Sequence, residues 1–274
     1  MNLTDRIVLV TGASSGIGAA TARAFAREGA HVVLLARTET KLAEVAEGIT
    51  DAGGEATPFP VDLTDSDAVT EVAATIRDDI GQPTVLVNIA GSGEFLAIEE
   101  TTPADAHRMM AVPYFAAFHV TRTFIPDLLA MNEGHIVNLT SAAAVTPWPG
   151  SVAYSTARWA IRGFTEALRA DLHGTNIGVT MVVAAEVESP YWEHNPGSRE
   201  RLPAISKLFP TLTPEDVADA IVDSVIECRR TVLIPRRFRI VAAVHRVFPR
   251  PIEWLVRKTG WRRMGNSSRL KDLR

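Results

Sequence analysis

Cysteine is almost absent from this sequence, and long apolar runs are absent altogether. Cys228 is the only cysteine among 274 residues, which excludes a disulfide scaffold and a metal site built on cysteine ligands. No stretch approaches the roughly 18 consecutive apolar residues that indicate a membrane-spanning helix. No His-Glu-x-x-His run and no zinc-type histidine spacing occurs, so no metal site is expected. We therefore expect a cytoplasmic protein without a spanning helix.

Acidic residues are scarce in the C-terminal 46 residues, whereas in residues 1–228 they outnumber basic ones. Residues 229–274 hold 14 of the 28 Lys and Arg residues but only 2 of the 32 Asp and Glu residues. A basic segment of this kind indicates contact with nucleic acid, a membrane or an acidic partner, or a solvated or self-docking tail. Nucleic acid is disfavoured, because the rest of the chain is acidic and carries no recognition motif.

Short apolar runs alternate with helix-length stretches through most of the chain. The expected strands are Ile7–Val10, His31–Leu35, Ala56–Val61, Thr84–Asn88, His135–Leu139, Gly178–Val183 and Thr231–Ile234. The expected helices run from near Ile17 to Gly29, over Glu39–Ala52, Asp65–Ile80, Pro103–Met131 and Ser151–His173, and after Thr213. This alternation predicts an α/β fold with a Rossmann-like doubly wound parallel sheet, in three αβα layers.

Two segments break the alternation. Residues 186–212 carry prolines, charges and aromatic side chains and are expected to form a long loop. Residues 236–274 follow the last strand and are expected to form a basic, partly helical extension. The sequence thus predicts one domain over residues 1–235, followed by that extension.

A glycine-rich loop follows the first expected strand and opens the first expected helix. Glycines at this point allow positive φ and let the backbone approach a pyrophosphate closely. The helix N-terminus then offers free N–H groups and a positive dipole to the phosphates. The sequence therefore predicts a dinucleotide phosphate site formed by Gly12, Ser14, Ser15, Gly16, Ile17 and Gly18.

The end of the second expected strand indicates which dinucleotide binds. An acidic side chain there usually holds a ribose 2′-hydroxyl, whereas a 2′-phosphate needs a cation. The chain has Arg37 at this point and no acid before Glu39. Since the planar guanidinium can pair with a phosphate, NADP(H) is favoured over NAD(H).

With its G-x-x-x-G-x-G spacing, the chain resembles the classical short-chain dehydrogenase/reductase family. Val61-Asp62-Leu63, Asn88-Ile89-Ala90-Gly91, Ser141 and Tyr154 carry the rest of the resemblance, which covers roughly residues 5–235. It implies a single-domain oxidoreductase acting on a small-molecule alcohol or carbonyl, as a homodimer or homotetramer. It also implies that the segment 186–212 covers the substrate. Its implied cofactor-binding residues, beyond the glycine loop, are Asp62, Leu63, Asn88, Ala90, Gly91, Tyr154, Arg158, Val187 and Ser189.

The resemblance assigns catalysis to Tyr154, Ser141 and Arg158. Hydride transfer changes the charge on a substrate oxygen, and a tyrosine hydroxyl can supply or take the accompanying proton. A free tyrosine has a pKa of about 10, so this role needs cationic neighbours near neutral pH. The serine hydroxyl would hydrogen-bond the same oxygen and orient it.

The chain departs from the family pattern around this relay. Arg158 replaces the family's lysine, and because it is effectively never deprotonated, a relay through a lysine amine would be impaired. Pro113 stands where the family has a catalytic asparagine, and it would strain a helix interior. Ala184-Ala185 replaces Pro-Gly, Ser189 replaces a threonine but keeps a hydroxyl for the carboxamide, and Ile89 replaces an asparagine.

Two main hypotheses follow from this pattern. The first is an active NADP(H)-dependent reductase or dehydrogenase for a small, hydrophobic substrate, with a modified relay. The alternative is a cofactor-binding protein with weak or no redox activity, acting as a sensor or structural partner. A third hypothesis is a lyase or isomerase that uses the nucleotide structurally or transiently.

The extension combines apolar side chains with arginines. Arg236-Arg237-Phe238-Arg239 precedes the apolar stretch 240–248, and a second mixed stretch covers 251–258. This pattern is typical of a helix lying on an anionic membrane, so peripheral membrane contact through 236–274 is one hypothesis. The other is that the extension covers the substrate cleft or a neighbouring subunit.

Overall fold

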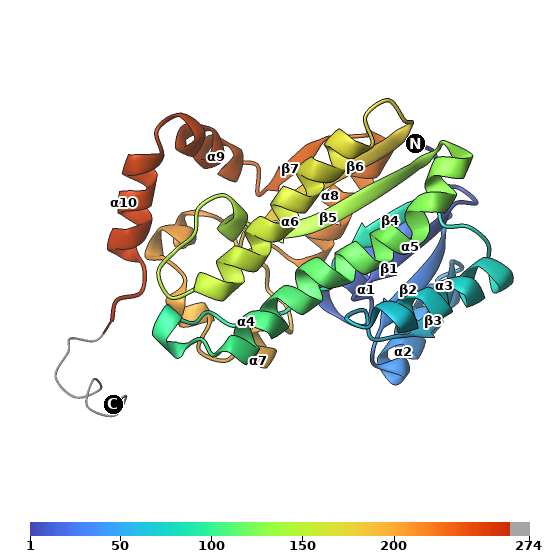
Figure 1. The fold of residues 1–274 in the computed structure, drawn as a ribbon, viewed down its shortest axis with the longest axis horizontal. Helices are drawn as coiled ribbons and strands as arrows, with labels where there is room; N and C mark the ends of the chain where they lie inside the picture. The colour runs from blue at the N-terminus through green and yellow to red at the C-terminus, as the bar shows by residue number, and fades with distance from the viewer. Residues whose placement is uncertain (264–274) are drawn as a thin grey trace.

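A parallel sheet of seven strands forms the centre of the molecule, shown in Figure 1. The computed structural model describes residues 1–263. In the order β3-β2-β1-β4-β5-β6-β7, the strands are β3 (Glu55–Pro60), β2 (His31–Ala36), β1 (Ile7–Thr11), β4 (Val85–Asn88), β5 (Gly134–Ser141), β6 (Ile177–Ala184) and β7 (Thr231–Ile234). Every adjacent pair runs parallel. All seven predicted strands are confirmed, with ends that differ from the predicted ones by at most two residues.

Helices cover both faces of the sheet, which confirms the predicted three-layer αβα arrangement (Figure 1). One layer contains α1 (Gly16–Arg27), α2 (Glu39–Asp51) and α8 (Pro214–Ile226). The other contains α3 (Ser66–Asp79), α5 (Ala116–Met131) and α6 (Val152–Asp171). Alternate strand residues point into the two layers: Val8 and Val10 pack under the first, and Leu9 under the second. Burial on both faces explains why the strands are almost wholly apolar.

Polar caps set the beginnings of several helices. The Asp65 carboxylate accepts hydrogen bonds from the N–H groups of Asp67 and Ala68, at 2.9 and 3.1 Å, and α3 begins there. Thr213 and Asp216 cap each other reciprocally, and Pro214 occupies the first helical position of α8. These side chains pair backbone donors that a helix N-terminus otherwise leaves without partners.

The predicted helix over 103–131 is continuous but not uniform. It consists of α4 (Pro103–Met110), a single π turn, η2 (Ala111–Phe115), and α5. The Ala116 N–H donates to the Ala111 carbonyl, five residues back. Pro113 lies buried in this turn. Because proline has no N–H and its ring clashes with the preceding turn, the widened π turn relieves the strain expected of it.

The segment 186–212 is a folded lobe rather than an extended loop. It contains three short helices, α7 (Tyr191–His194), η4 (Arg199–Arg201) and η5 (Ala204–Leu208). Its two ends are joined, because Glu188 N–H donates to Leu212 O and Leu212 N–H donates to Glu186 O, both at 2.9 Å. Two further 3₁₀ turns, η1 (Ile98–Glu100) and η3 (Ala142–Ala144), lie earlier in the chain.

The C-terminal extension forms two helices, α9 (Phe238–Val247) and α10 (Pro249–Thr259), at one end of the molecule (Figure 1). α9 contacts β7, and α10 contacts η5 of the lobe. Arg263 forms an ion pair with Glu99, at 2.6 Å between Nε and Oε1. The extension thus docks on its own chain. Its last part, 264–274, lies outside the described residues.

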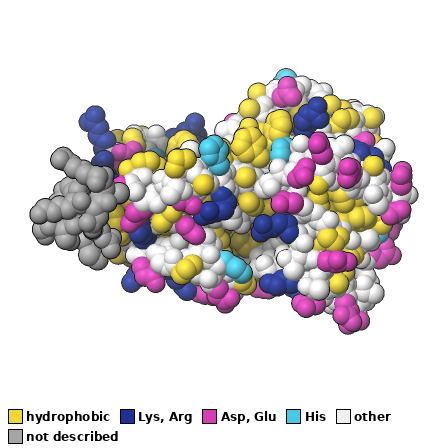
Figure 2. Space-filling model, turned by 60° about the horizontal axis from the view of Figure 1, so that its bottom comes forward, with side chains coloured by type: hydrophobic (Ala, Val, Ile, Leu, Met, Phe, Trp, Pro, Cys, Tyr) yellow, Lys and Arg dark blue, Asp and Glu magenta, His cyan; other side chains and the backbone are white. Residues whose placement is uncertain are grey.

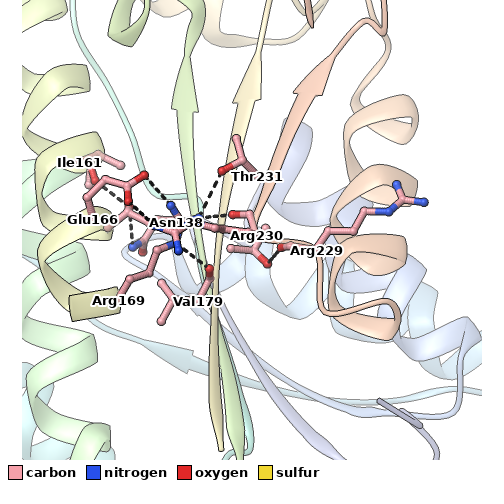
Figure 3. A network of polar contacts seen from close by, with 10 residues as sticks. Asn138, Ile161, Glu166, Arg169, Val179, Arg229, Arg230 and Thr231 are labelled. Carbon is pink, nitrogen blue, oxygen red and sulfur yellow. Dashed lines mark hydrogen bonds and ion pairs between the residues drawn. The ribbon is translucent and has the colours of Figure 1, made fainter. Parts of the chain in front are cut away.

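A buried arginine joins α6 to the outer strands, as Figure 3 shows. The Arg169 guanidinium donates to Glu166 on its own helix at 2.6 Å and to the Val179 carbonyl of β6 at 3.0 Å. It also reaches the Arg230 carbonyl just before β7. Glu166 in turn accepts from the Arg230 side chain at 2.9 Å. This network joins α6 to the last two strands of the sheet, and none of Arg169, Glu166 and Arg230 lines the cavity described below.

None of the helices within residues 1–263 combines the length and the apolar character needed to cross a bilayer. The same residues hold no group of three or more His, Cys, Asp or Glu side chains that could bind a metal ion.

Candidate active site

A cavity of about 550 Å³ opens at the carboxyl ends of the strands, where β1 and β4 lie side by side. The chain leaves β3 at one edge and re-enters the sheet beside β1, which makes this the topological switch point. Thr11 joins the two strands: its hydroxyl donates to Val87 O and accepts from the N–H groups of Ile89 and Ala90, at 2.9 and 3.0 Å. The cavity therefore lies where such folds bind ligands.

The glycine loop forms one wall of the cavity, and its glycines are required sterically. Gly12 has φ +68° and Gly16 has φ +50°. A Cβ on Gly18 would lie 2.0 Å from the carbonyl oxygen of Gly12, so no side chain fits there. α1 begins at Gly16, and Ser15, at its N-cap, makes no side-chain cap hydrogen bond. The predicted loop residues that line the cavity are Gly12, Ser14, Ser15, Gly16, Ile17 and Gly18. This cradle fits a pyrophosphate.

Cations gather at the end of β2, beside the predicted adenosine side of the cavity. Arg37 lines the cavity as predicted, and so does Lys41, which sequence reasoning missed. The available signal for Lys41 was its place in the first turn of α2, directly after the end of β2. Asp62 also lines the cavity; a hydrogen bond from the Thr64 N–H, at 2.9 Å, is the main cause of the lowered pKa of its carboxyl, and the charge of Arg37 contributes less.

Three predicted catalytic residues line one cavity from neighbouring elements. Ser141 ends β5, and its Oγ accepts from the Ala143 N–H at 3.3 Å, which leaves its own proton free to donate. Tyr154 lies in the first turn of α6, and Arg158 lies one turn later. Both are nearly buried, with 7% and 8% of their surfaces exposed. The spacing of four residues places both side chains on the same face of the helix.

Arg158 packs on Tyr154 and against a glycine. Its Cζ lies 4.8 Å from the centroid of the Tyr154 ring, and its Nη2 donates to the Ser92 carbonyl at 3.2 Å. A Cβ on Gly91 would lie 3.0 Å from Nη1, so glycine at this position gives the guanidinium its space. The Nε atom is buried and has no hydrogen-bond partner within the part of the chain that the structure describes.

Most of the remaining predicted cofactor residues line the cavity, and Asn88 does not. Those that do are Leu63, Ala90, Gly91, Val187 and Ser189. The Asn88 amide donates instead to Asn138 Oδ1 at 2.8 Å and to Thr121 Oγ1 at 3.2 Å, inside the protein. Its predicted place on the adenosine side of the cleft is therefore not observed. The side chain ties β4 to β5 and α5.

The replacement of the family's asparagine removes a polar group from this region. Pro113 is buried in the π turn and does not line the cavity, although its neighbour Val112 does. Ile89 and the pair Ala184-Ala185, which depart from the family pattern, also line the wall. These positions add apolar surface near the catalytic candidates.

Aromatic side chains surround the other end of the cavity. Phe95 packs on Tyr154, with ring centroids 4.6 Å apart, and on Trp148, at 5.2 Å. Trp192 from the 186–212 lobe meets Phe95 edge to face. Phe95 and Trp148 were not predicted, because they belong to no motif and converge only in the folded chain. All four line the cavity and make this end apolar.

Tyr191 joins the 186–212 lobe to the segment that follows β4. Its hydroxyl donates to the Gly93 carbonyl. Burial, and secondarily the neighbouring Tyr154, raise the pKa of Tyr191 well above its usual range. Tyr191 therefore stays protonated and acts as a hydrogen-bond donor to the backbone.

Two polar atoms in the aromatic end have no protein partner. Thr146 Oγ1 and Trp148 Nε1 belong to residues that line the cavity, but the two atoms are themselves buried and form no hydrogen bond with any residue between 1 and 263. A buried donor without a partner is unfavourable unless a ligand or water satisfies it. Since both atoms have almost no accessible surface, they are not contacts that the cavity offers to a bound molecule.

Comparison with protein families and relatives agrees with this geometry. The family model for short chain dehydrogenases matches residues 6–198. The chain is 32% identical over 228 residues to a fatty acyl-CoA reductase of Acinetobacter baylyi, covering 82% of this chain and 75% of that protein. It is 34% identical over 279 residues to an uncharacterized oxidoreductase of Mycobacterium tuberculosis, covering 98% and 79% respectively.

Solved structures show the same fold. A short chain dehydrogenase/reductase from Burkholderia phymatum in complex with NAD has a TM-score of 0.82 at 24% identity, covering 97% of this chain and 100% of that chain. A metagenomic short-chain oxidoreductase in complex with NADP has a TM-score of 0.71 at 32% identity, covering 85% and 98%.

Proposed function

The chain belongs to the short-chain dehydrogenase/reductase family of oxidoreductases, and from this we propose that it interconverts a carbonyl and an alcohol on an apolar substrate, using NADP(H). One observation carries the proposal. Ser141, Tyr154 and Arg158 line a single cavity together with the glycine loop. A hydroxyl pair and a fixed cation thus share one enclosed space with a phosphate cradle.

The residues around the cradle fit a dinucleotide, and those at the end of β2 favour NADP(H) over NAD(H). Arg37 and Lys41 supply two cations where a 2′-phosphate would lie, and no acidic side chain precedes Glu39 there. Such a phosphate would form charge-assisted hydrogen bonds with them. When bound, the nicotinamide supplies or accepts the hydride.

The three catalytic side chains have separate roles in this proposal. The Ser141 hydroxyl donates to the substrate oxygen and orients it. Tyr154 gives that oxygen its proton during reduction and removes it during oxidation. The Arg158 guanidinium, next to the Tyr154 ring, compensates the negative charge that remains on the tyrosine oxygen. Because arginine is effectively never deprotonated, Arg158 supplies charge and does not relay the proton.

The cavity walls indicate the class of substrate. Phe95, Trp148 and Trp192 favour an apolar molecule. The name of the Acinetobacter baylyi relative, a fatty acyl-CoA reductase, is consistent with an apolar carbonyl substrate. An apolar carbonyl compound is therefore the substrate class that this proposal favours.

The functional unit in this proposal is a homodimer or homotetramer. Several apolar side chains of η2, α5 and α6 leave 37–45% of their surfaces exposed: Phe115, Phe118, Val152 and Trp159. Phe118 also packs on Phe164, at 6.0 Å between ring centroids. Exposed aromatic clusters of this kind are common where subunits meet.

A second candidate function remains, and the altered relay supports it. Pro113 gives the cavity no polar group, and Arg158 cannot move a proton. A cofactor-binding protein without turnover would tolerate both changes. A lyase or isomerase would likewise need no hydride acceptor.

Binding and turnover separate these functions. Titrating the protein with NADPH and NADH, followed by cofactor fluorescence, should show tighter binding of NADPH. NADPH oxidation is then measured with hydrophobic ketones, aldehydes and quinones. We expect oxidation of NADPH with at least one apolar carbonyl. Binding without oxidation of NADPH by any member of the panel would instead support the second candidate.

A further inference from the structure

The C-terminal helices form a cap, residues 236–263, whose inner face closes the cavity. Val241 of α9 and Ile252 and Val256 of α10 line the cavity wall. Phe238, which is buried, packs edge to face on Phe209 of the 186–212 lobe, with ring centroids 5.8 Å apart. The cap therefore lies between the substrate end of the cavity and the outside of the molecule.

The outer face of the cap is also apolar. Ile240, Ala243, Val244 and Val247 recur at the i, i+3, i+4, i+7 spacing along α9, and all are exposed. Ile240 and Val247 leave 68% and 67% of their surfaces exposed. Phe248 and Trp254 continue the apolar surface, with 64% and 55% exposed. Such a stripe on a helix normally faces a core, so its exposure indicates a surface that binds something.

Cations border this apolar stripe. Arg236, Arg237, Arg239, Arg246 and Arg250 are exposed, and none forms an ion pair with another residue of the range 1–263. On α10, the ammonium of Lys258 lies 4.6 Å from the centroid of the Trp254 ring, and Arg257 is exposed beside it. Figure 2 shows hydrophobic and basic side chains together at this end of the molecule, at the upper left.

We propose that the outer face of the cap, centred on Ile240, Val244, Val247 and Trp254, docks on an anionic lipid surface. Apolar side chains flanked by arginines and a tryptophan suit the boundary between acyl chains and negative head groups. A second copy of the chain is a poor occupant, because a two-fold contact would bring the same arginines face to face. The positive charge of the cap therefore favours binding to a negatively charged surface over binding to the cap of a second copy.

Docking in this way would connect the bilayer with the cavity. The lipid-facing and cavity-facing sides of α9 are about one helix diameter apart, so only this helix would separate an apolar substrate dissolved in the bilayer from the cavity. This consequence rests on the proposed function, whereas the docking itself does not.

The test is flotation of the full-length protein with phosphatidylcholine vesicles, with and without phosphatidylglycerol, in the absence of nucleotide and substrate. We expect the protein to float with the anionic vesicles, to float far less with neutral ones, and to be released by salt. The double variants Val244→Glu/Val247→Glu and Arg239→Glu/Arg246→Glu should each lower the partition coefficient about tenfold or more. The matched control is Ile226→Glu, which changes an exposed apolar residue of α8.

Two results would overturn the docking proposal. The first is a flotation result without the expected dependence: the wild-type protein does not float with the anionic vesicles, or the cap variants float as well as the wild type. The other is cap variants whose oligomeric state falls while vesicle binding is absent, which would make the cap a protein interface. NADPH binding and circular dichroism of the variants show that they are folded. A protein that floats but never oxidises NADPH would defeat the proposed function and leave the docking standing.

Discussion

The guanidinium carbon of Arg158 lies 4.8 Å from the centroid of the Tyr154 ring, and both side chains are almost completely buried. A cation stacked on an aromatic face is attracted to it, more strongly when both are shielded from water. This contact fixes a positive charge beside the residue to which we assign proton transfer. Arg158 therefore keeps a cation beside Tyr154 although the chain lacks the family's lysine.

The charge of Arg158 is therefore expected to matter more than its shape. Arg158→Met should lower kcat for carbonyl reduction about 100-fold, because the charge left on Tyr154 loses its compensation. Arg158→Lys, which keeps the charge, should stay within about tenfold of the wild type. Steady-state NADPH oxidation measures both. The control is Arg162→Met, since Arg162 stacks on Trp159 in the same way and does not line the cavity. Equal rates for the Met and Lys variants at position 158 would refute a charge role.

Arg37 is expected to decide the choice of cofactor. Arg37→Ala should raise the Kd for NADPH about 10- to 100-fold, which corresponds to the loss of one charged hydrogen-bonding partner. The Kd for NADH should hardly change, because NADH has no 2′-phosphate. Fluorescence titration measures both constants, with Arg122→Ala as an exposed arginine control on α5. A parallel loss for both cofactors would place Arg37 outside the 2′-phosphate site.

The exposed aromatic face of α5 and α6 is expected to hold the subunits together. Phe118→Glu should convert the oligomer to single chains, because it places a charge inside an apolar contact. Analytical ultracentrifugation measures the mass, and Ile226→Glu, on the opposite helical layer, should leave the mass unchanged. A wild type that sediments as one chain would contradict the proposed assembly.

Acid destabilisation should depend on one buried histidine. Burial, with a smaller effect of the positive N-terminus, lowers the pKa of His135 from 6.5 to about 4, and its Nε2 contacts Thr180 Oγ1 at 2.7 Å. The unfolded chain binds a proton at pH values where the folded chain does not. Stability from this group is therefore present above pH 6.5 and is lost as the pH falls toward 4, by up to about 3 kcal/mol.

The difference in unfolding free energy between the wild type and His135→Asn, measured by urea denaturation across this pH range, isolates that contribution. The wild type should lose stability relative to the variant as the pH falls. His173→Asn, at an exposed histidine, is the matched control substitution. Parallel slopes for the wild type and His135→Asn would show that His135 titrates alike in the folded and unfolded chains.

Local patterns in the sequence were sufficient to predict the strands of the sheet and the glycine loop that forms the phosphate cradle. Strands such as β1 are apolar because helices cover both faces, and the glycines of the loop are required by contacts within a few residues, as between Gly18 and Gly12. The proximity of Tyr154 and Arg158 was also predictable, because residues four positions apart lie on the same face of a helix.

Contacts between distant segments could not be predicted. Phe95, Trp148 and Trp192 meet only in the folded chain, and no spacing links them. The direction of the Asn88 side chain depends on Asn138 and Thr121, which belong to other elements. The amphipathic pattern of α9 predicted a helix with a binding face. It could not show that one side closes the cavity while the other stays exposed.

The most direct test of the account is NADPH oxidation by Tyr154→Phe, measured with the best carbonyl substrate of the wild type and paired with NADPH titration. Removing one oxygen atom takes away the proton donor and leaves the ring under Arg158 in place. The account predicts a loss of at least about 100-fold in kcat with an unchanged Kd for NADPH. Turnover within a few-fold of the wild type would contradict it, because the proton would then come from another group.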